Sequence, residues 1–143
     1  MYTKQISVFL ENKRGRLAEV TGLLNDEGIN IRALELADTV DFGVLRLIVN
    51  DRGRCLDILK AHGLAAQETD VLAVEVEDKP GSLHHIVAAL DRDGVNIEYM
   101  YAFFEKKGDH VIAVFKSDNA TRAVEALKKG GISILPEDMI QNL

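Results

Sequence analysis

The sequence contains the same pattern twice, and this internal repeat constrains the fold more than any other feature. Aligning Gly15 with Gly81 sets an offset of 66 residues. At this offset nine positions are identical in the two copies: Val8/Val74, Glu11/Glu77, Lys13/Lys79, Gly15/Gly81, Leu17/Leu83, Leu24/Leu90, Gly28/Gly94, Asn30/Asn96 and Ile31/Ile97. A repeat at a fixed offset predicts a duplicated structural unit. We therefore expect one domain at residues 1–69 and a second copy at residues 70–143.

The register of the repeat slips after Phe42. Gly63 aligns with Gly131 at an offset of 68 rather than 66. Loops tolerate insertions more readily than helices or strands. We expect the extra residues of the second copy in a loop at Glu105 to Asp109.

Hydrophobic periodicity predicts the same order of elements in both copies. Apolar residues first alternate, as in a half-buried strand, then recur at helical spacing up to a glycine suited to a helix end. Two strands, a second helix and a short strand follow. In the first copy these elements are Ile6 to Leu10, Leu17 to Leu24, Ile31 to Ala37, Val44 to Val49, Cys55 to His62 and the region of Leu64. In the second copy they are Val74 to Val76, Leu83 to Leu90, Ile97 to Phe104, Val111 to Phe115, Ala120 to Lys129 and Ile132 to Leu135.

This order, β-α-β-β-α-β, predicts an α+β fold of two ferredoxin-like modules in tandem. In such a module two helices cover one face of an antiparallel sheet. Only Glu68 to Asp70 separate the last strand of the first copy from the first strand of the second. A module of about 70 residues buries a modest core, so we expect the two modules to pack together.

Charge and cysteine content exclude several partners. The formal net charge is −6, so the chain lacks the positive field that attracts nucleic acid. Cys55 is the only cysteine, which excludes an internal disulfide and makes the cytoplasm the expected location. No stretch reaches the roughly 18 apolar residues that a membrane span requires. We expect no nucleic-acid partner, no membrane partner, no metal and no cofactor.

The candidate binding residues lie where the first strand of each copy leads into a helix. These segments are Glu11 to Leu17 and Glu77 to Leu83, each with a glycine before the helix. Glycine allows close approach to the backbone, and the N-terminus of a helix favours an anion such as an α-carboxylate. At the other end of the helix Asn30 or Asn96 offers a donor and an acceptor that suit an ammonium group. The same residues also suit a purely structural role in turns and helix ends.

The pattern x-[ND]-[KR]-x-G-x-L, a helix and then G-[IV]-N-I resembles the ACT family of regulatory amino-acid-binding domains. The resemblance covers nearly the whole chain and occurs twice. It implies a ligand between two modules, in contact with the loop before the first helix of one and the second strand of its neighbour. The candidate ligand-binding residues are Asn12, Lys13, Arg14, Gly15, Arg16, Leu17, Asn30 and Ile31 in the first copy, and Asp78, Pro80, Gly81, Ser82, Leu83, Asn96 and Ile97 in the second.

The two copies differ in the charge of these segments. Lys13, Arg14 and Arg16 place three cations in the first copy. Arg14 also departs from the proline that is usual at this position in the ACT family, which the second copy keeps as Pro80. Asp78 replaces Asn12 in the second copy and would repel a carboxylate. The sequence therefore predicts the tighter carboxylate contact at Asn12 to Leu17, completed by Asn30 or by a neighbouring module.

Other residues carry weaker signals. Arg46 interrupts an apolar strand and suits either solvent or a bound carboxylate. The alternating aromatic residues of one strand, with one neighbour, suit the core, an apolar pocket or a partner interface: Tyr99, Tyr101, Phe103 and Phe104. The four histidines have no metal-ligand spacing, and Cys55 suits a buried thiol.

The leading hypothesis is a non-enzymatic regulatory sensor of a free amino acid, with a slight preference for an apolar or aromatic one. A module without its own ligand that docks a metabolic enzyme in trans is the alternative. An enzyme subunit that uses Glu11, Asp78 or His85 is less favoured, because no nucleophile has a base beside it. Apolar residues on both faces of strands also predict a homo-oligomer, such as a dimer.

Overall fold

The computed structural model describes residues 2–38, 41–104 and 110–141. The chain forms two compact units. The N-terminal unit is Lys4–Thr69, and the C-terminal unit is Asp70–Leu143 together with the residues that precede Lys4. Within the described ranges, no helix has the length and apolar character needed to span a membrane.

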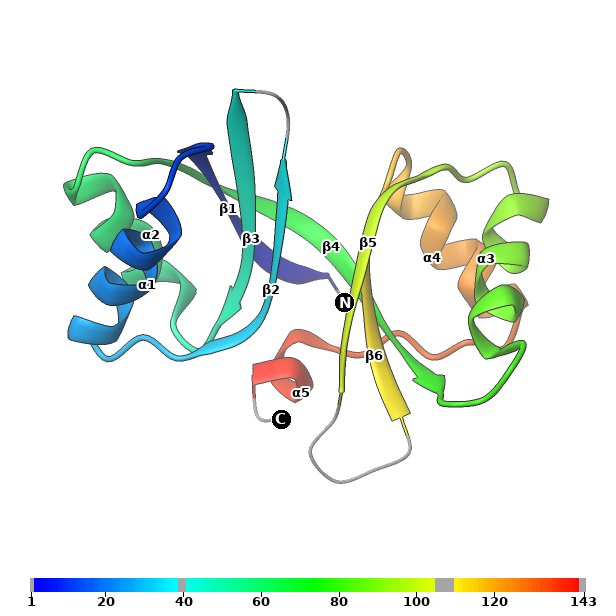
Figure 1. Cartoon of the computed structure of the whole chain (residues 1–143). Helices are drawn as coiled ribbons and strands as arrows, with labels where there is room; N and C mark the ends of the chain where they lie inside the picture. The colour runs from blue at the N-terminus through cyan, green and yellow to red at the C-terminus, as the bar shows by residue number, and fades with distance from the viewer. Residues whose placement is uncertain (1, 39–40, 105–109, 142–143) are drawn as a thin grey trace. The chain divides into compact units, whose positions relative to one another are not determined.

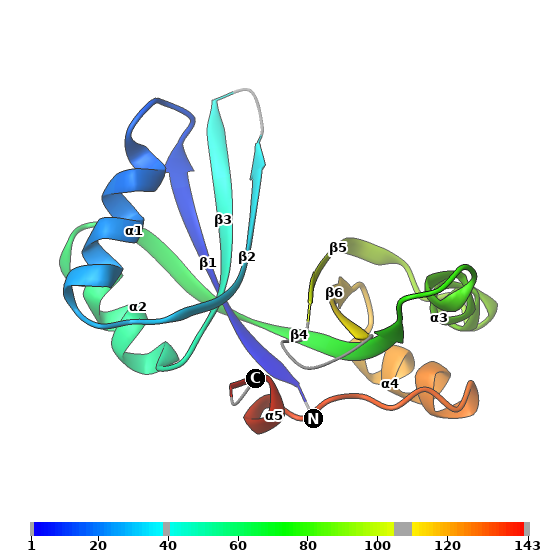
Figure 2. The ribbon, with the colours of Figure 1, turned by 60° about the horizontal axis from the view of Figure 1, so that its bottom comes forward.

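The N-terminal unit has the predicted β-α-β-β-α-β order (Figure 1). Both helices lie on the same side of the strands (Figure 2). Strand β3 is the central partner of β1 and β2, both antiparallel to it, and β1 is also a neighbour of β4. The elements are β1 (Thr3–Glu11), α1 (Arg16–Asp26), β2 (Ile31–Asp38), β3 (Phe42–Val49), α2 (Arg52–Ala61) and the beginning of β4 (Ala65–Glu77).

The C-terminal unit repeats this arrangement, with β6 between β4 and β5 in antiparallel pairing. Its two longer helices again share one side of the strands (Figure 1). After β4 come α3 (Ser82–Arg92), β5 (Ile97–Phe104), β6 (His110–Ser117), α4 (Ala120–Lys129) and α5 (Glu137–Gln141). The predicted fold class, two ferredoxin-like modules of the α+β class, is confirmed.

The structure differs from the predicted elements at the end of each copy. The last strand of the first copy continues into the first strand of the second as one strand, β4, rather than stopping near Glu68. In the second copy the predicted strand Ile132 to Leu135 is reduced to a single bridge between Val74 and Ile134 and one hydrogen bond to Ala73. Pro136 follows at once and has no N–H to donate to a strand partner.

The bounds of the elements preserve both offsets of the repeat. Helices α1 and α3 begin 66 residues apart, whereas β3 and β6 begin 68 residues apart. The slip therefore falls between β5 and β6, where the sequence predicts the extra loop residues. The predicted loop Glu105 to Asp109 itself lies outside the described residues.

Each unit has its own hydrophobic core between its helices and one face of its strands. In the N-terminal unit strand residues such as Ile6 and Val8 pack with Leu24 of α1 and Leu59 of α2. Cys55 belongs to this core, so the predicted buried thiol is confirmed. Desolvation, and secondarily the charge of Asp51, raises the pKa of the Cys55 thiol to about 11.

Core packing predicts that substitutions of two leucines in α3 change the free energy of unfolding by very different amounts. Leu90 is fully buried in the C-terminal core, whereas Leu83 is 47% exposed. Leu90→Ala should lower the free energy of unfolding by about 2–5 kcal/mol because it leaves a cavity. Leu83→Ala should change it by less than about 1 kcal/mol. Urea denaturation of both variants measures the difference, and equal losses would contradict the assigned core.

Exposed apolar side chains on the edge strands predict self-association. Among the strands that the structure describes, β2 and β5 stand at the two ends of the strand order with one neighbour each, and Leu34 on β2 is 51% exposed. An unpaired edge with apolar side chains is a site for pairing with another chain. We expect a dimer in sedimentation experiments, and Leu34→Lys should shift it toward monomer while Leu83→Lys does not. A single 15.8 kDa species for the native chain at micromolar concentration would disprove this expectation.

Candidate functional site

The two glycine segments share one backbone geometry. Gly15 has φ 90° and Gly81 has φ 89°, a left-handed conformation that favours glycine. A Cβ atom at either position would meet no atom within 4 Å, so the space in front of the backbone is open. The Lys13 N–H donates to the Glu11 carbonyl at 2.9 Å, and the Lys79 N–H donates to the Glu77 carbonyl at the same distance. We call these segments, residues 11–17 and 77–83, the N-terminal loop and the C-terminal loop.

Helices α1 and α3 begin at these loops without a side-chain cap. The other two long helices differ, because the side chain of Asp51 or Asn119 accepts a hydrogen bond from the first turn. In the described part of the chain, the second and third N–H groups of α1 and α3 have no acceptor. Such free N–H groups, together with the helix dipole, favour an anion.

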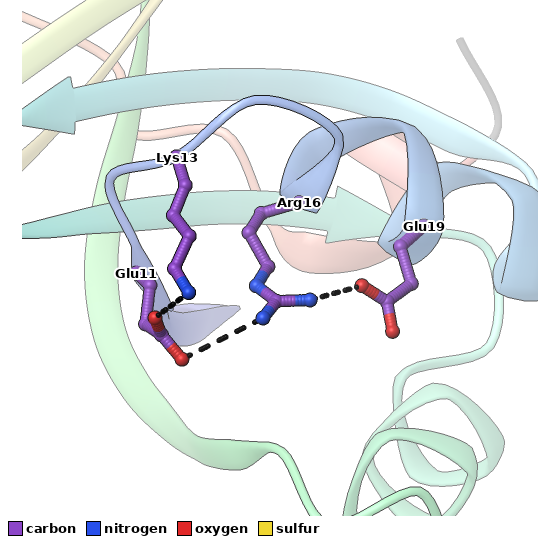
Figure 3. Close-up of polar contacts among 4 residues, drawn as sticks. All are labelled: Glu11, Lys13, Arg16 and Glu19. Atoms are coloured by element: carbon purple, nitrogen blue, oxygen red, sulfur yellow. Dashed lines mark hydrogen bonds and ion pairs between the residues drawn. The ribbon is translucent and has the colours of Figure 1, made fainter.

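In the N-terminal loop the cations already face carboxylates (Figure 3). The Lys13 ammonium lies 2.9 Å from a Glu11 carboxylate oxygen. The Arg16 guanidinium lies 2.9 Å from Glu19 and 3.7 Å from Glu11. The hydrogen bond and charge of Lys13, and then the charge of Arg16, hold the pKa of Glu11 below its usual value. Two of the three cations expected to bind a ligand carboxylate are therefore partly neutralised.

A pocket of about 630 Å³ lies beside the C-terminal loop. Its charged groups form two pairs: Lys79 with Glu77 at 2.8 Å, and His110 Nδ1 with Glu75 at 3.4 Å. The hydrogen bond and charge of Lys79, and then the charge of His110, lower the pKa of Glu77. The lining residues are Glu75, Val76, Glu77, Lys79, Pro80, Gly81, Ser82, His85, Ile86, His110, Gly131, Ile132 and Ser133. Residues of the N-terminal loop line a cavity of only about 70 Å³. A pocket of about 390 Å³ lies farther along α1, and it is lined by Ala18, Glu19, Gly22, Leu23, Asp26, His62 and Leu64.

The structure brings together only some of the predicted site residues. Pro80, Gly81 and Ser82 line the large pocket. Asn12, Lys13 and Leu17 line the small cavity, with Leu10, Glu11, Leu36, Asp38 and Gly43. The other predicted residues line neither: Arg14, Gly15, Arg16, Asn30, Ile31, Asp78, Leu83, Asn96 and Ile97.

Sequence reasoning missed most of the wall of the large pocket. His110 begins β6, and the segment of residues 131–133 follows α4, so both are far from Gly81 in the sequence. The strand pairing brings His110 opposite Glu77, the last residue of β4. The alignment of Gly63 with Gly131 and the predicted strand Ile132 to Leu135 marked the region after α4 in advance, but neither indicated a binding role.

The two asparagines lie at the opposite end of the first helix from the glycine loops. The Asn30 N–H donates to Asn50 Oδ1 at 2.9 Å, and the Asn96 N–H donates to Asp118 Oδ1 at 3.0 Å. Helix α1 has 11 residues and α3 has the same length. At about 1.5 Å per residue, each helix spans about 16 Å. Within one unit, the asparagine and the glycine loop therefore do not hold the same small ligand.

The other candidates also have structural partners or positions away from the pocket. The Arg46 guanidinium pairs with Glu35 on the adjacent strand at 2.6 Å. Tyr99, Tyr101 and Phe103 lie on the face of β5 opposite Met100, which packs against the C-terminal core, and none of them lines the pocket. Among the described residues, no group of three or more His, Cys, Asp or Glu side chains is placed to hold a metal ion.

Comparison with solved structures finds the same fold in other proteins. Protein BT0572 from Bacteroides thetaiotaomicron is 38% identical, with a TM-score of 0.92, and the match covers 100% of this chain and 98% of that one. The regulatory subunit of aspartate kinase from Thermus thermophilus has a TM-score of 0.63 at 16% identity, covering 89% and 91% of the two chains. The regulatory subunit of aspartate kinase from Thermus flavus has a TM-score of 0.62 at 17% identity, covering 90% and 92%.

A comparison with curated protein sequences found no significant match. The family model described as an ACT domain pair matches residues 1–143. This match covers both repeats, in agreement with the two β-α-β-β-α-β units of the structure. The chain therefore belongs to the ACT domain pair family.

Proposed function

We propose that this protein is a regulatory module, without catalytic activity of its own, that binds a free amino acid in the pocket beside Gly81. The pocket itself carries the proposal. Its volume of about 630 Å³ falls within the range of about 300–1,000 Å³ that is typical of small-molecule sites. The cavity of about 70 Å³ that the N-terminal loop lines falls well below that range, and the pocket of about 390 Å³ along α1 includes no residue of this loop.

The pocket has complementary groups for both charges of an amino acid. The open N-terminus of α3 and the Lys79 ammonium favour the α-carboxylate. Glu75 or Glu77 accepts the α-ammonium group, since both carboxylates line the same pocket. The apolar contacts come from Val76, Ile86 and Ile132.

This proposal reverses the ranking of the two loops that their sequences suggest. Asp78 does not line the pocket, although its neighbours Glu77 and Lys79 do. Lys13 and Lys79 each pair with the glutamate two residues earlier, so they do not distinguish the loops. Arg16, in contrast, already pairs with two carboxylates of the N-terminal unit, whereas Ser82 stands at its position in the C-terminal loop. Exposed charges that already have partners offer less to an incoming anion, because solvent and the partner both screen them.

Regulation follows if the amino acid binds one conformation or assembly more tightly than another. The two Thermus chains of the same fold are regulatory subunits of aspartate kinase. By analogy, we propose that this chain acts in the cytoplasm as a homo-oligomer and regulates a metabolic enzyme in trans. A docking module without a ligand remains the alternative, and it differs by predicting no response to amino acids.

A screen of the twenty amino acids tests the proposed ligand class. A ligand that binds only the folded state at a hundredfold excess over its Kd adds about 2.7 kcal/mol to stability. The Tm should therefore rise by several degrees with the cognate amino acid, and calorimetric titration should show heat. If no amino acid at millimolar concentration raises the Tm, the docking module replaces the sensor.

A matched pair of glycine variants locates the binding loop. Gly81→Ala and Gly15→Ala impose the same strain, since both residues have nearly the same φ and equally open surroundings. Each should cost about 1 kcal/mol of stability. Gly81→Ala should also weaken amino-acid binding by roughly tenfold, or about 1.4 kcal/mol, because the added methyl group stands in the path of the ligand. Weaker binding in Gly15→Ala alone would move the site to the N-terminal loop.

A further inference from the structure

The two glycine loops have the same backbone, but residues of the C-terminal loop line a pocket of about 630 Å³, whereas those of the N-terminal loop line a cavity of about 70 Å³. The difference begins at the first residue of the helix, which is Arg16 in α1 and Ser82 in α3. We propose that this residue decides which loop accepts a carboxylate: Arg16 closes the N-terminal loop, and Ser82 leaves the C-terminal loop open.

Equivalent backbone positions carry the two side chains. The Arg16 N–H donates to the Lys13 carbonyl at 3.4 Å, and the Ser82 N–H donates to the Lys79 carbonyl at 3.4 Å. One turn later, the N–H groups of Glu19 and His85 donate to the glycine carbonyls at 3.0 Å. Because the loops themselves share their backbone, their side chains set the difference in charge at the two helix starts.

The Arg16 guanidinium joins the two ends of the N-terminal loop. Figure 3 shows it between the carboxylates of Glu11, at the end of β1, and Glu19, in the first turn of α1. Each exposed ion pair is weak, worth about 0–1 kcal/mol. The two carboxylates nevertheless occupy the Arg16 guanidinium and place negative charge beside the start of α1, where a ligand carboxylate would bind. They also repel it.

The C-terminal loop lacks this bridge. The Ser82 side chain is short, and its buried Oγ has no hydrogen-bond partner among the described residues. His85 stands where the N-terminal unit has Glu19, so the first turn of α3 carries no carboxylate at this position. Ser82 and His85 both line the large pocket. An open, uncapped helix end therefore remains accessible beside Lys79.

This inference rests on the proposed function in one respect, which is that the ligand has a carboxylate and places it at the C-terminal loop. Acetate tests the loop by itself, because it is a carboxylate without an ammonium group or side chain. Binding is followed by the amide signals of residues 81–84 and 15–18 in NMR spectra of the full chain. Sodium chloride at the same ionic strength provides the control for non-specific shifts.

The test exchanges the two residue pairs between the loops. Ser82→Arg with His85→Glu builds the N-terminal bridge into the C-terminal loop, and Arg16→Ser with Glu19→His makes the reverse exchange. In the native chain, acetate should shift the signals of residues 81–84 and leave those of residues 15–18 unchanged. The first exchange should weaken the C-terminal response by roughly tenfold, close to 1.4 kcal/mol. The second should preserve that response and add one in residues 15–18.

Equal acetate responses of the two loops in the native chain would overturn the inference. An undiminished response after Ser82→Arg with His85→Glu would overturn it as well, and so would the absence of any response in residues 81–84 of the native chain. If that variant does not fold, a new response of residues 15–18 after Arg16→Ser with Glu19→His supports the inference, and its absence overturns it. If acetate shifts residues 81–84 but no amino acid raises the Tm, the proposed function fails while this inference stands.

Discussion

Burial of one sheet face under two helices is the constraint on which each unit depends. Both helices of a unit must lie on the same side, so the chain crosses from strand to helix at one end of the unit and returns at the other. In the N-terminal unit this packing buries Leu24 and Leu59 against Val8 and Leu45. It also fixes where the first helix begins, and therefore where its free N–H groups point.

The two helices of a unit differ in how their first backbone N–H groups are satisfied. The second helix of each unit begins with a side-chain cap from Asp51 or Asn119, which satisfies one of its first N–H groups. The first helix begins at a glycine with positive φ and has no side-chain cap, so its second and third N–H groups stay available. In the proposed function, the ligand therefore binds at the first helix of a unit, whose start has no side-chain cap.

Duplication supplied two such helix ends, and their later differences are electrostatic. Gly15 and Gly81 have almost the same φ angle. Strands β2 and β5 also begin with the same irregularity in their register. Arg16 of the N-terminal loop lies between two carboxylates, whereas the C-terminal loop has Ser82 at that position and lines a pocket. A single chain with one closed and one open loop would respond to a ligand through one unit while keeping the other as a structural partner.

The sequence by itself determined the duplication, the order of elements and the two glycine turns. These features depend on local periodicity and on backbone conformations that only glycine adopts readily, so they are visible without a structure. It also predicted the boundary slip from Gly63 and Gly131. It did not predict the continuous strand β4 or the reduced last strand, because both depend on pairing with distant residues.

Only the tertiary structure decided how the charged residues combine. Counting charges along the chain favoured the N-terminal loop, because Lys13 and Arg16 appear there without visible partners. Folding places Glu11 and Glu19 beside them, and it places His110 and residues 131–133 around Gly81. Ion pairs and cavities depend on distances between side chains from separate elements, and a linear sequence does not contain those distances.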